Sequence, residues 1–344
     1  MKANNVKRYL GPIQMKNSQL RLVLSVVLSV ALTATLAALS GGAQAQDRYP
    51  SRPIEIIVPT PPGGGTDLVF RRLAELVEPI LGQKVVVVNK PGGGGVLGMA
   101  AVTSARPDGY TLAGVVNSPL TMVPHMQPAP YGPNDYVAIS LADSSPGVMC
   151  AKADFPAKDA KDLIEHLKKN AGKYTYGNDG VGGNIHLAFE RVFFKVGVKL
   201  RPVPFGGAGE TLKNFLGGHI DFFGGSVSTI LPYVKDGTAK CLLVMGTDRL
   251  NSLPNSMTLA DIGLSDQATL VWHGLVGPKA MASDRVALLE KAFMQAASSE
   301  KFRKDMEPRG LKIEASSSAD FRKLIDSEYK AMGELMMQLG LAKK

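Results

Sequence analysis

Short apolar runs alternate with amphipathic segments along most of this chain. Three runs in the first part have the length and apolar content of buried strands: residues 54–58, 85–88 and 110–116. Helical patterns at about 66–81 and 96–106 separate them, and Gly82 is placed to end the first helix. This βαβαβ order predicts a parallel sheet that is covered on both faces.

The same alternation resumes after a Pro-rich stretch at residues 119–133. We expect strands at residues 148–151, 174–176, 200–203, 222–223 and 241–245. We expect helices at residues 160–170, 184–196, 209–216 and 229–235, and three amphipathic helical segments within residues 283–341. The pattern therefore predicts an α/β fold with two α/β halves and a helical C-terminal region.

The N-terminal region has the layout of a secretory signal peptide. A basic segment ends at Arg21, an apolar run covers residues 22–39, and an Ala-x-Ala site ends at Ala45. Met1 and Met15 both remain open as the start. An uncleaved anchor is the alternative, because this run of 18 residues, interrupted only by Ser and Thr, is just long enough to span a bilayer. We expect residues 1–45 to be removed and the mature protein to be exported to the periplasm.

The charge of the chain does not indicate nucleic-acid binding. The 344 residues carry a formal net charge of +9, but five of the 39 Lys and Arg residues lie before residue 46, where there is no acidic residue. The rest has 34 basic against 30 acidic residues, and only 6% of the whole chain is aromatic. A basic stripe studded with aromatic residues is therefore not supported.

The two cysteines, Cys150 and Cys241, both lie in apolar, strand-like runs. An oxidising compartment permits a disulfide between them, and two buried free thiols are equally natural. The sequence leaves both possibilities open. The five histidines have no metal-ligand spacing, so we expect no metal.

The sequence supports no cofactor-binding or catalytic motif. The sequence Gly93-x-Gly95-x-x-Gly98 formally matches the dinucleotide fingerprint. It follows the second expected strand, however, and no acidic residue stands about twenty residues further on. There is no P-loop and no Gly-x-Ser-x-Gly elbow, and no His-centred triad can be assembled. We therefore expect no cofactor and no enzymatic activity, with an exported, hydrolase-like enzyme as the alternative.

Gly-rich turns precede three of the expected helices, at residues 63–65, 180–184 and 206–209. Main-chain N–H groups at the positive end of a helix dipole can bind an anion without a basic side chain. Thr66 or Asp67 could cap the first of these helices. A plain tight turn is the alternative for the turn at 63–65 on physical grounds alone. Three such turns facing one cleft predict a site for a small anion.

An ordered set of motifs carries a resemblance to a known family. The motifs lie at residues 49–54, 59–67, 89–95, 106–112, 177–187, 203–207, 216–221 and 272–275. With them the chain resembles the Bug family, the periplasmic solute receptors of tripartite tricarboxylate transporters, over almost the whole length after Tyr49.

The resemblance implies a two-lobed periplasmic-binding-protein fold of the Venus flytrap, type II-like kind, with two crossings between the lobes. Residues 47–145 and 272–344 would form the first lobe, and residues 146–271 the second. The function implied is capture of a small organic carboxylate and its delivery to membrane permease subunits by a monomeric receptor.

Loops from both lobes would form the ligand site in such a receptor. The expected binding residues are Pro62, Gly63, Gly64, Gly65, Thr66, Asp67, Asn117, Ser118, Asn178, Gly182, Asn184, His186, Phe205, Gly207, Ala208 and Ser226.

Two departures from the family pattern bear on the ligand. A run of Ser is usual where this chain has residues 178–184, and an acid is usual where it has Gly225. Fewer hydroxyls and a missing acid argue against an amino acid and leave room for an aromatic or apolar carboxylate. The ligand class expected overall is a di- or tricarboxylate or an aromatic acid. Tyr176, Phe205 and Trp272 could form apolar walls, or could equally be plain core residues.

Overall fold

The computed structural model describes residues 49–338 and 342–343. The expected signal peptide lies outside these residues. From Pro50 onward the chain forms one compact unit. Within the described ranges, no helix is both long and apolar enough to cross a membrane.

The first three strands form a parallel sheet, as the alternation of patterns predicts. β1 (Ile54–Val58) lies between β2 (Val85–Asn89) and β3 (Thr111–Val116) and runs parallel to both. The connecting helices are α2 (Gly65–Leu81) and α3 (Val96–Thr103). Gly82 ends α2 with φ of 66°, a conformation that glycine adopts without steric cost.

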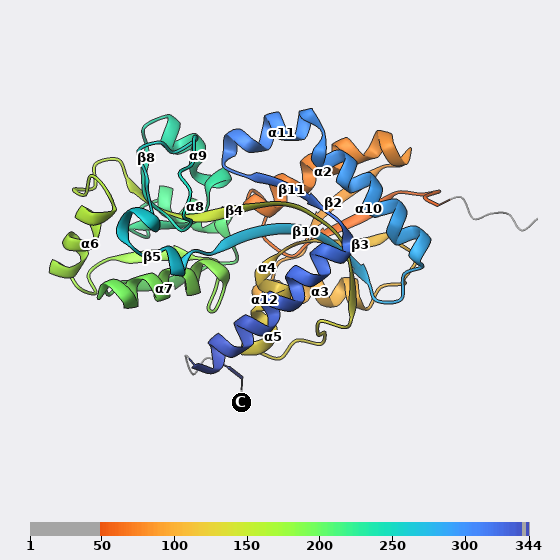
Figure 1. The fold of residues 1–344 in the computed structure, drawn as a ribbon, viewed down its shortest axis with the longest axis horizontal. Coiled ribbons are helices and arrows are strands. Elements are labelled where there is room, and N and C mark those ends of the chain that lie inside the picture. Colours follow the sequence, from red (N-terminus) through yellow and green to blue (C-terminus); the bar gives the residue numbers. More distant parts are fainter. Residues whose placement is uncertain (1–48, 339–341, 344) are drawn as a thin grey trace, which may run out of the picture. The chain divides into compact units, whose positions relative to one another are not determined.

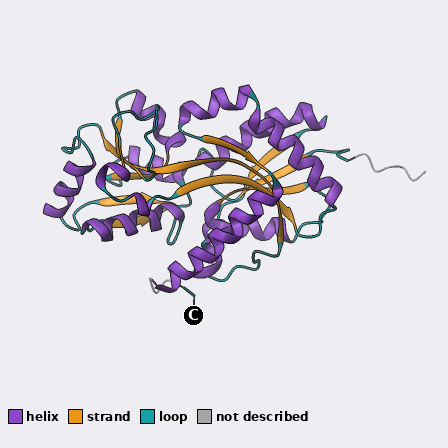
Figure 2. Ribbon diagram, in the orientation of Figure 1, coloured by secondary structure: helices purple, strands orange, loops and turns teal. Residues whose placement is uncertain are grey.

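A second parallel group of strands lies at the other end of the sheet. β7 (Phe222–Ser226) pairs with β5 (Thr175–Asn178), which pairs with β6 (Arg201–Pro204). The helices of this lobe are α6 (Ala160–Lys169), α7 (Asn184–Val196), α8 (Ala208–Leu216) and α9 (Val227–Lys235), and β8 (Ala239–Val244) and β9 (Met257–Thr258) complete its strands. Helices flank the strands in both lobes (Figure 2).

Two long antiparallel strands connect the lobes, so the sheet is mixed rather than parallel throughout. β4 (Tyr136–Lys152) and β10 (Leu270–Pro278) pair with each other, and Figure 1 shows them running side by side across the molecule. The expected strand at 148–151 is only the end of β4. Ser140 and the polar run at 143–145 interrupt the apolar pattern, and buried polar residues therefore concealed most of this strand.

The Pro-rich stretch also contains structure that the pattern did not indicate. Two short helices, α4 (Asn117–Thr121) and α5 (Val123–Met126), follow β3. Main-chain bonds close each of them, from the N–H of Met122 to the carbonyl of Ser118 and from the N–H of Gln127 to the carbonyl of Val123, both at 3.1 Å.

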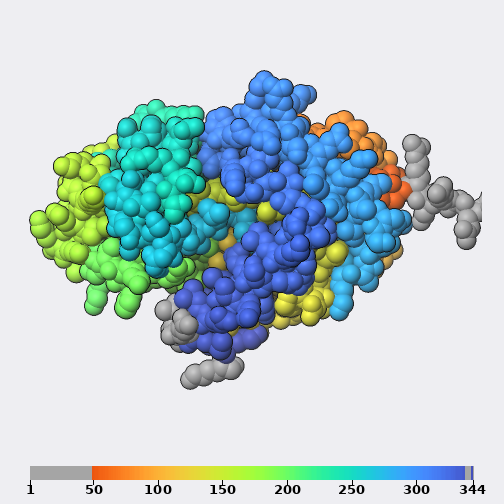
Figure 3. Space-filling model, in the orientation of Figure 1, coloured from red at the N-terminus to blue at the C-terminus, as the bar shows by residue number. Residues whose placement is uncertain are grey.

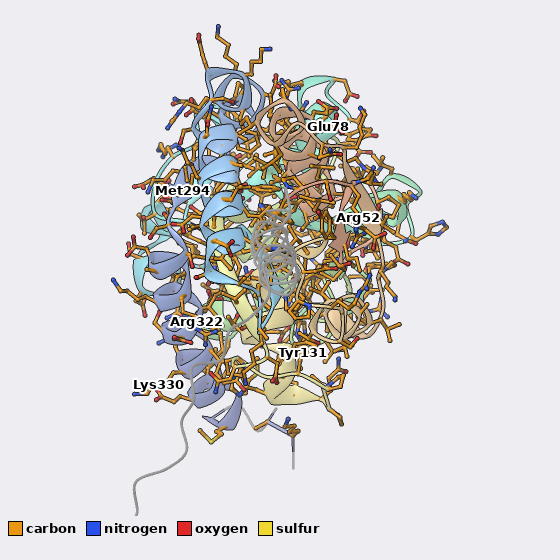
Figure 4. The ribbon with its side chains drawn as sticks, turned by 90° about the vertical axis from the view of Figure 1, so that its right-hand side faces the viewer. Arg52, Glu78, Tyr131, Met294, Arg322 and Lys330 are labelled. Atoms are coloured by element: carbon orange, nitrogen blue, oxygen red, sulfur yellow. A yellow bond between two sulfur atoms is a disulfide. The ribbon has the colours of Figure 1, made fainter. Side chains whose placement is uncertain are left out.

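The C-terminal region packs against the first lobe. It comprises α10 (Ser283–Ser298), α11 (Glu300–Met306), β11 (Lys312–Ser316) and α12 (Ser318–Gln338), of which β11 was not expected. In Figure 4, Met294 of α10 and Glu78 of α2 lie on neighbouring helices, while Arg322 and Lys330 follow each other along α12. The dark blue α12 covers part of the face in Figure 3.

The pairing of β4 indicates where the chain passes from one lobe to the other. Pro146 pairs with Leu270 of β10, whereas the next residue, Gly147, pairs with Ser226 of β7. These registers favour a crossing close to residues 145 and 271. The lobe boundaries at 47–145, 146–271 and 272–344 stay a prediction.

A disulfide joins Cys150 and Cys241, which resolves the alternative that the sequence left open. The two residues are partners on the neighbouring strands β4 and β8, and their Cα atoms are 3.9 Å apart. The bond closes a chain segment with a sequence separation of 91 residues. Loops of that length restrict the unfolded chain strongly, so the bond should stabilise the fold.

Replacing both cysteines by alanine should lower the free energy of unfolding by about 2–4 kcal/mol. Thermal unfolding of the wild type and of the Cys150→Ala/Cys241→Ala variant, each with and without reductant, measures this. Reductant should lower the melting temperature of the wild type only. A variant that melts with the wild type would show that the bond contributes nothing to stability.

Candidate functional site

A cavity lies where the loops of the two lobes meet. Together with its mouth and the open solvent there, it contains about 680 Å³ of space. The loops after β1 and β2, the end of β3 with helix α4, the segments at the starts of α7 and α8, the end of β7 and strand β10 all contribute to it. The lining residues are Pro59, Thr60, Pro61, Gly64, Gly65, Thr66, Gly94, Val116, Ser118, Pro119, Asp179, Ile185, Gly206, Gly207, Ala208, Gly225, Ser226, Val271 and His273.

The N-terminus of α2 faces this cavity without a side-chain cap. Gly64 is the N-cap residue and adopts an extended conformation, so the expected capping by Thr66 or Asp67 is wrong. The first N–H groups of a helix have no acceptor within the helix. Those at the start of α2 are therefore available to a ligand.

Asp67 stabilises the turn instead of the ligand site. Its carboxylate accepts hydrogen bonds from the N–H of Gly63 and the amide of Asn89, both at 2.9 Å, and pairs with Arg71 at 2.9 Å. Burial alone would raise its pKa, but the bonds from Arg71, Gly63 and Asn89 outweigh burial and lower the pKa. The side chain is saturated by partners of its own lobe.

Two further helices present uncapped N-termini from the second lobe. Gly207 is the N-cap of α8 and Ser226 that of α9, and neither helix has a side-chain cap. The Ser226 hydroxyl is bonded to the Thr229 hydroxyl at 2.8 Å. The positive ends of three helix dipoles thus meet at one cavity, which favours a negative charge there.

The fourth turn, before α7, is already occupied by an acid of the chain. The Asp179 carboxylate accepts hydrogen bonds from the N–H of Ile185 at 3.1 Å and of His186 at 3.2 Å. The expected anion seat at 180–184 is therefore wrong, because an internal carboxylate uses its donors. The sequence did not identify this cap, because Asp179 lies before the N-cap position of α7, which is Gly183.

Asp179 also changes the expected charge of the cavity. It is partly exposed and lines the cavity, although it is not among the expected binding residues. Burial raises its pKa to about 6, although the bonds from His186 and Ile185 lower it. Near neutral pH this carboxyl is mostly ionised, and it repels a ligand anion unless it gains a proton.

The amides of Asn117 and Asn184 bind the strand between the lobes instead of the cavity. Both donate to the carbonyl of Leu270, at 3.2 and 3.3 Å. Asn117 also donates to Glu328 of α12 at 2.9 Å, and Trp272 donates to the same carboxylate at 2.5 Å. Burial raises the pKa of Glu328, while the bonds from Trp272, Asn117 and Thr121 lower it; the net shift is upward.

The expected binding residues therefore fall into two groups. Those that line the cavity are Gly64, Gly65, Thr66, Ser118, Gly207, Ala208 and Ser226. Those outside its lining are Pro62, Gly63, Asp67, Asn117, Asn178, Gly182, Asn184, His186 and Phe205. Most of the second group bond within the loops; His186 Nδ1, for example, accepts from the N–H of Gly182 at 2.9 Å.

The aromatic walls that the sequence allowed are not part of the lining. Tyr176 is fully buried in the core of the second lobe, and Trp272 packs edge-on against Phe321 with ring centroids 5.1 Å apart. Phe205 packs against the hydrophobic cluster beneath α8 and α9. The apolar lining comes instead from proline and aliphatic side chains: Pro59, Pro61, Val116, Pro119, Ile185 and Val271.

A buried His–Asp pair at the cavity was missed by sequence reasoning. His273 of β10 lines the cavity, and its Nδ1 lies 2.7 Å from Oδ1 of Asp143 on β4. The two residues are partners across the strand pair. The motif at residues 272–275 contained this histidine, but nothing in the sequence indicated its partner 130 residues away.

No Lys or Arg lines the cavity within the described chain, and its residues contain no cluster of His, Cys, Asp and Glu suited to a metal ion. A ligand anion would rely on main-chain donors, hydroxyls and the single imidazole of His273.

Comparison with known proteins assigns this architecture to a family. The model of the tripartite tricarboxylate transporter family receptor matches residues 69–341. A protein in the gbd 5′ region of Cupriavidus necator is 34% identical over 317 residues, covering 91% of this chain and 95% of that protein. The structure of the periplasmic binding protein BugD is 29% identical with a TM-score of 0.79, covering 86% of this chain and all of that chain.

More distant structures share the fold and were solved with ligands. MatC from Rhodopseudomonas palustris, with bound malate, is 23% identical with a TM-score of 0.77, covering 83% of this chain and 99% of that chain. Another R. palustris protein, with adipate, is 21% identical with a TM-score of 0.81, covering 86% and 99%. These neighbours are solute-binding proteins rather than enzymes, and the chain described here belongs to the tripartite tricarboxylate transporter family of receptors.

Proposed function

We propose that this receptor captures a small organic carboxylate in the cavity and presents it to permease subunits in the periplasm. The observation that carries the proposal is the meeting of three uncapped helix N-termini, those of α2, α8 and α9, at one cavity whose described lining residues include no Lys or Arg. Such a site binds an anion through main-chain N–H groups. The malate and adipate bound by two fold neighbours are of this chemical class.

The loops that would hold the ligand are also the loops by which the lobes touch. A Cβ on Gly209 would lie 2.8 Å from the carbonyl oxygen of Pro62 and 2.9 Å from the nitrogen of Gly64. A Cβ on Gly65 would lie 2.7 Å from the hydroxyl of Ser226. Ligand capture and lobe contact therefore depend on the same residues.

A panel of malate, adipate and benzoate, with succinamide as an uncharged control, tests this function. A carboxylic acid of the panel that binds only the folded protein should raise the melting temperature. At a ligand concentration of 100 times its Kd, it should stabilise the folded state by about 2.7 kcal/mol. Thermal shift measures the stabilisation, and the ligand should be recovered unchanged. A melting temperature that no acid raises would contradict carboxylate binding.

Gly65→Ala should weaken binding of the best acid of the panel by more than tenfold. The added methyl group meets the Ser226 hydroxyl, at a distance that real Cβ contacts essentially never show. Gly132→Ala is the matched control, because its Cβ would have only Asp135 near it, at 3.8 Å. Calorimetry compares the two, and adding Ser226→Gly to Gly65→Ala should restore part of the affinity. If both alanine variants bind with equal affinity, the close approach of Gly65 to Ser226 is not needed for binding.

Thr66→Val should weaken binding by about tenfold, the loss of one hydrogen bond of about 1.4 kcal/mol. The Thr66 side chain lines the cavity, and no described residue bonds to its hydroxyl. Lys90→Ala should change affinity less than threefold, because Lys90 is exposed and does not line the cavity. If the Lys90 variant loses binding and the Thr66 variant keeps it, a cation rather than the turn holds the ligand.

A further inference from the structure

His273 is the basic side chain that the described chain brings to the lining of the cavity. It lies on β10, the return strand between the lobes, with Val116 of β3 opposite it on one side and Asp143 of β4 on the other. Its side chain is 2% exposed and that of Asp143 is fully buried. The imidazole is therefore held firmly at the base of the site.

The contact with Asp143 determines which ring nitrogen is left for a ligand. The distance of 2.7 Å between Nδ1 and Oδ1 is that of a strong hydrogen bond, and a carboxylate can only accept it. Nδ1 therefore carries a proton, and no described residue bonds to Nε2. The neutral ring accepts a hydrogen bond at Nε2, whereas the protonated ring donates one.

Within the described part of the chain, Asp143 is the acid that pairs with the imidazole. Oδ2 of Asp143 is buried and has no hydrogen-bond partner. On β11, Lys312 pairs with Glu314, which also accepts from Ser144 Oγ at 2.7 Å.

The remaining acids near β10 are engaged elsewhere. Glu328 of α12 is bonded to Trp272, Asn117 and Thr121. Asp179 lines the same cavity as His273 and is itself negative when ionised. A bound anion thus meets one acid and one imidazole, and a proton on either group makes the cavity more favourable to it.

We propose that His273 determines specificity by taking up a proton at Nε2 when the ligand binds, and by donating that proton to a second anionic group of the ligand. The proton comes from solvent, and Asp143 stabilises the resulting imidazolium. The ligand class is then a dicarboxylate, with one carboxylate at the helix N-termini and the other at His273. This inference rests on the proposed function.

Three single variants separate the contributions to this pair. His273→Asn keeps a donor for Asp143 but removes Nε2. Asp143→Asn keeps an acceptor for Nδ1 but removes the charge that stabilises the imidazolium. His219→Asn is the matched control, because His219 is exposed and lies outside the cavity lining.

Calorimetry at pH 7 in two buffers of different ionisation enthalpy counts the protons taken up with each ligand. Adipate is the dicarboxylate probe, hexanoate is the monocarboxylate of equal chain length, and malate is a shorter diacid. ¹⁵N shifts of labelled histidines report directly whether Nε2 of His273 is protonated, and the His273→Asn spectrum assigns its signal among the five histidines.

The wild type should bind a diacid with proton uptake, and Nε2 of His273 should change from unprotonated to protonated. His273→Asn should bind that diacid at least tenfold more weakly, as for the loss of a charge-assisted bond, and its affinity for hexanoate should change little. Asp143→Asn should reduce the uptake, and His219→Asn should match the wild type.

Two results would overturn the inference, and they are distinguishable. Diacid binding that leaves Nε2 of His273 unprotonated contradicts its role and leaves the proposed function intact. A wild-type protein whose melting temperature and histidine signals respond to none of the acids contradicts the proposed function, and the proton uptake with it. Unfolding curves of each variant show whether a lost affinity reflects a lost fold.

Discussion

Close approach between main-chain segments of the two lobes is the constraint on which the cavity depends. The turn at 61–65 and the turn at 206–209 come so near that a Cβ on Gly206 would lie 2.9 Å from Pro61 Cγ, and one on Gly209 would lie 2.8 Å from a carbonyl oxygen. Larger residues would hold these turns apart. Because helices α2 and α8 begin in the same turns, the glycines that permit the approach also bring uncapped N–H groups to the ligand space.

The strands between the lobes give this contact a fixed base. β4 and β10 pair along most of their length, and α12 is attached to them through Glu328, which accepts from Trp272 at 2.5 Å. Asn117 of the first lobe and Asn184 of the second donate to one carbonyl, that of Leu270. Polar side chains that resembled ligand donors in the sequence thus hold the region where the two lobes join.

The electrostatics of the site follow from this arrangement. Three helix dipoles favour a bound anion, and the carboxylate of Asp179 opposes it. The described lining residues include no Lys or Arg that would add positive charge. His273 is placed to respond because its partner Asp143 is buried on the neighbouring strand and uses one ring nitrogen only. The charge state of the cavity is therefore expected to depend on pH and on the ligand.

The sequence by itself determined most of the helices and strands, though not β10, α4 or α5, together with the family and the turns at 63–65 and 206–209. These features are local: glycine, apolar periodicity and helix starts act within a few residues. It could not reveal that Asp179 occupies the turn at 180–184 or that β11 joins the sheet. The Cys150–Cys241 bond and the Asp143–His273 pair join residues that are 91 and 130 positions apart. Only strand pairing in the folded chain decides which distant side chains meet, and the tertiary structure therefore decided the chemistry of the cavity.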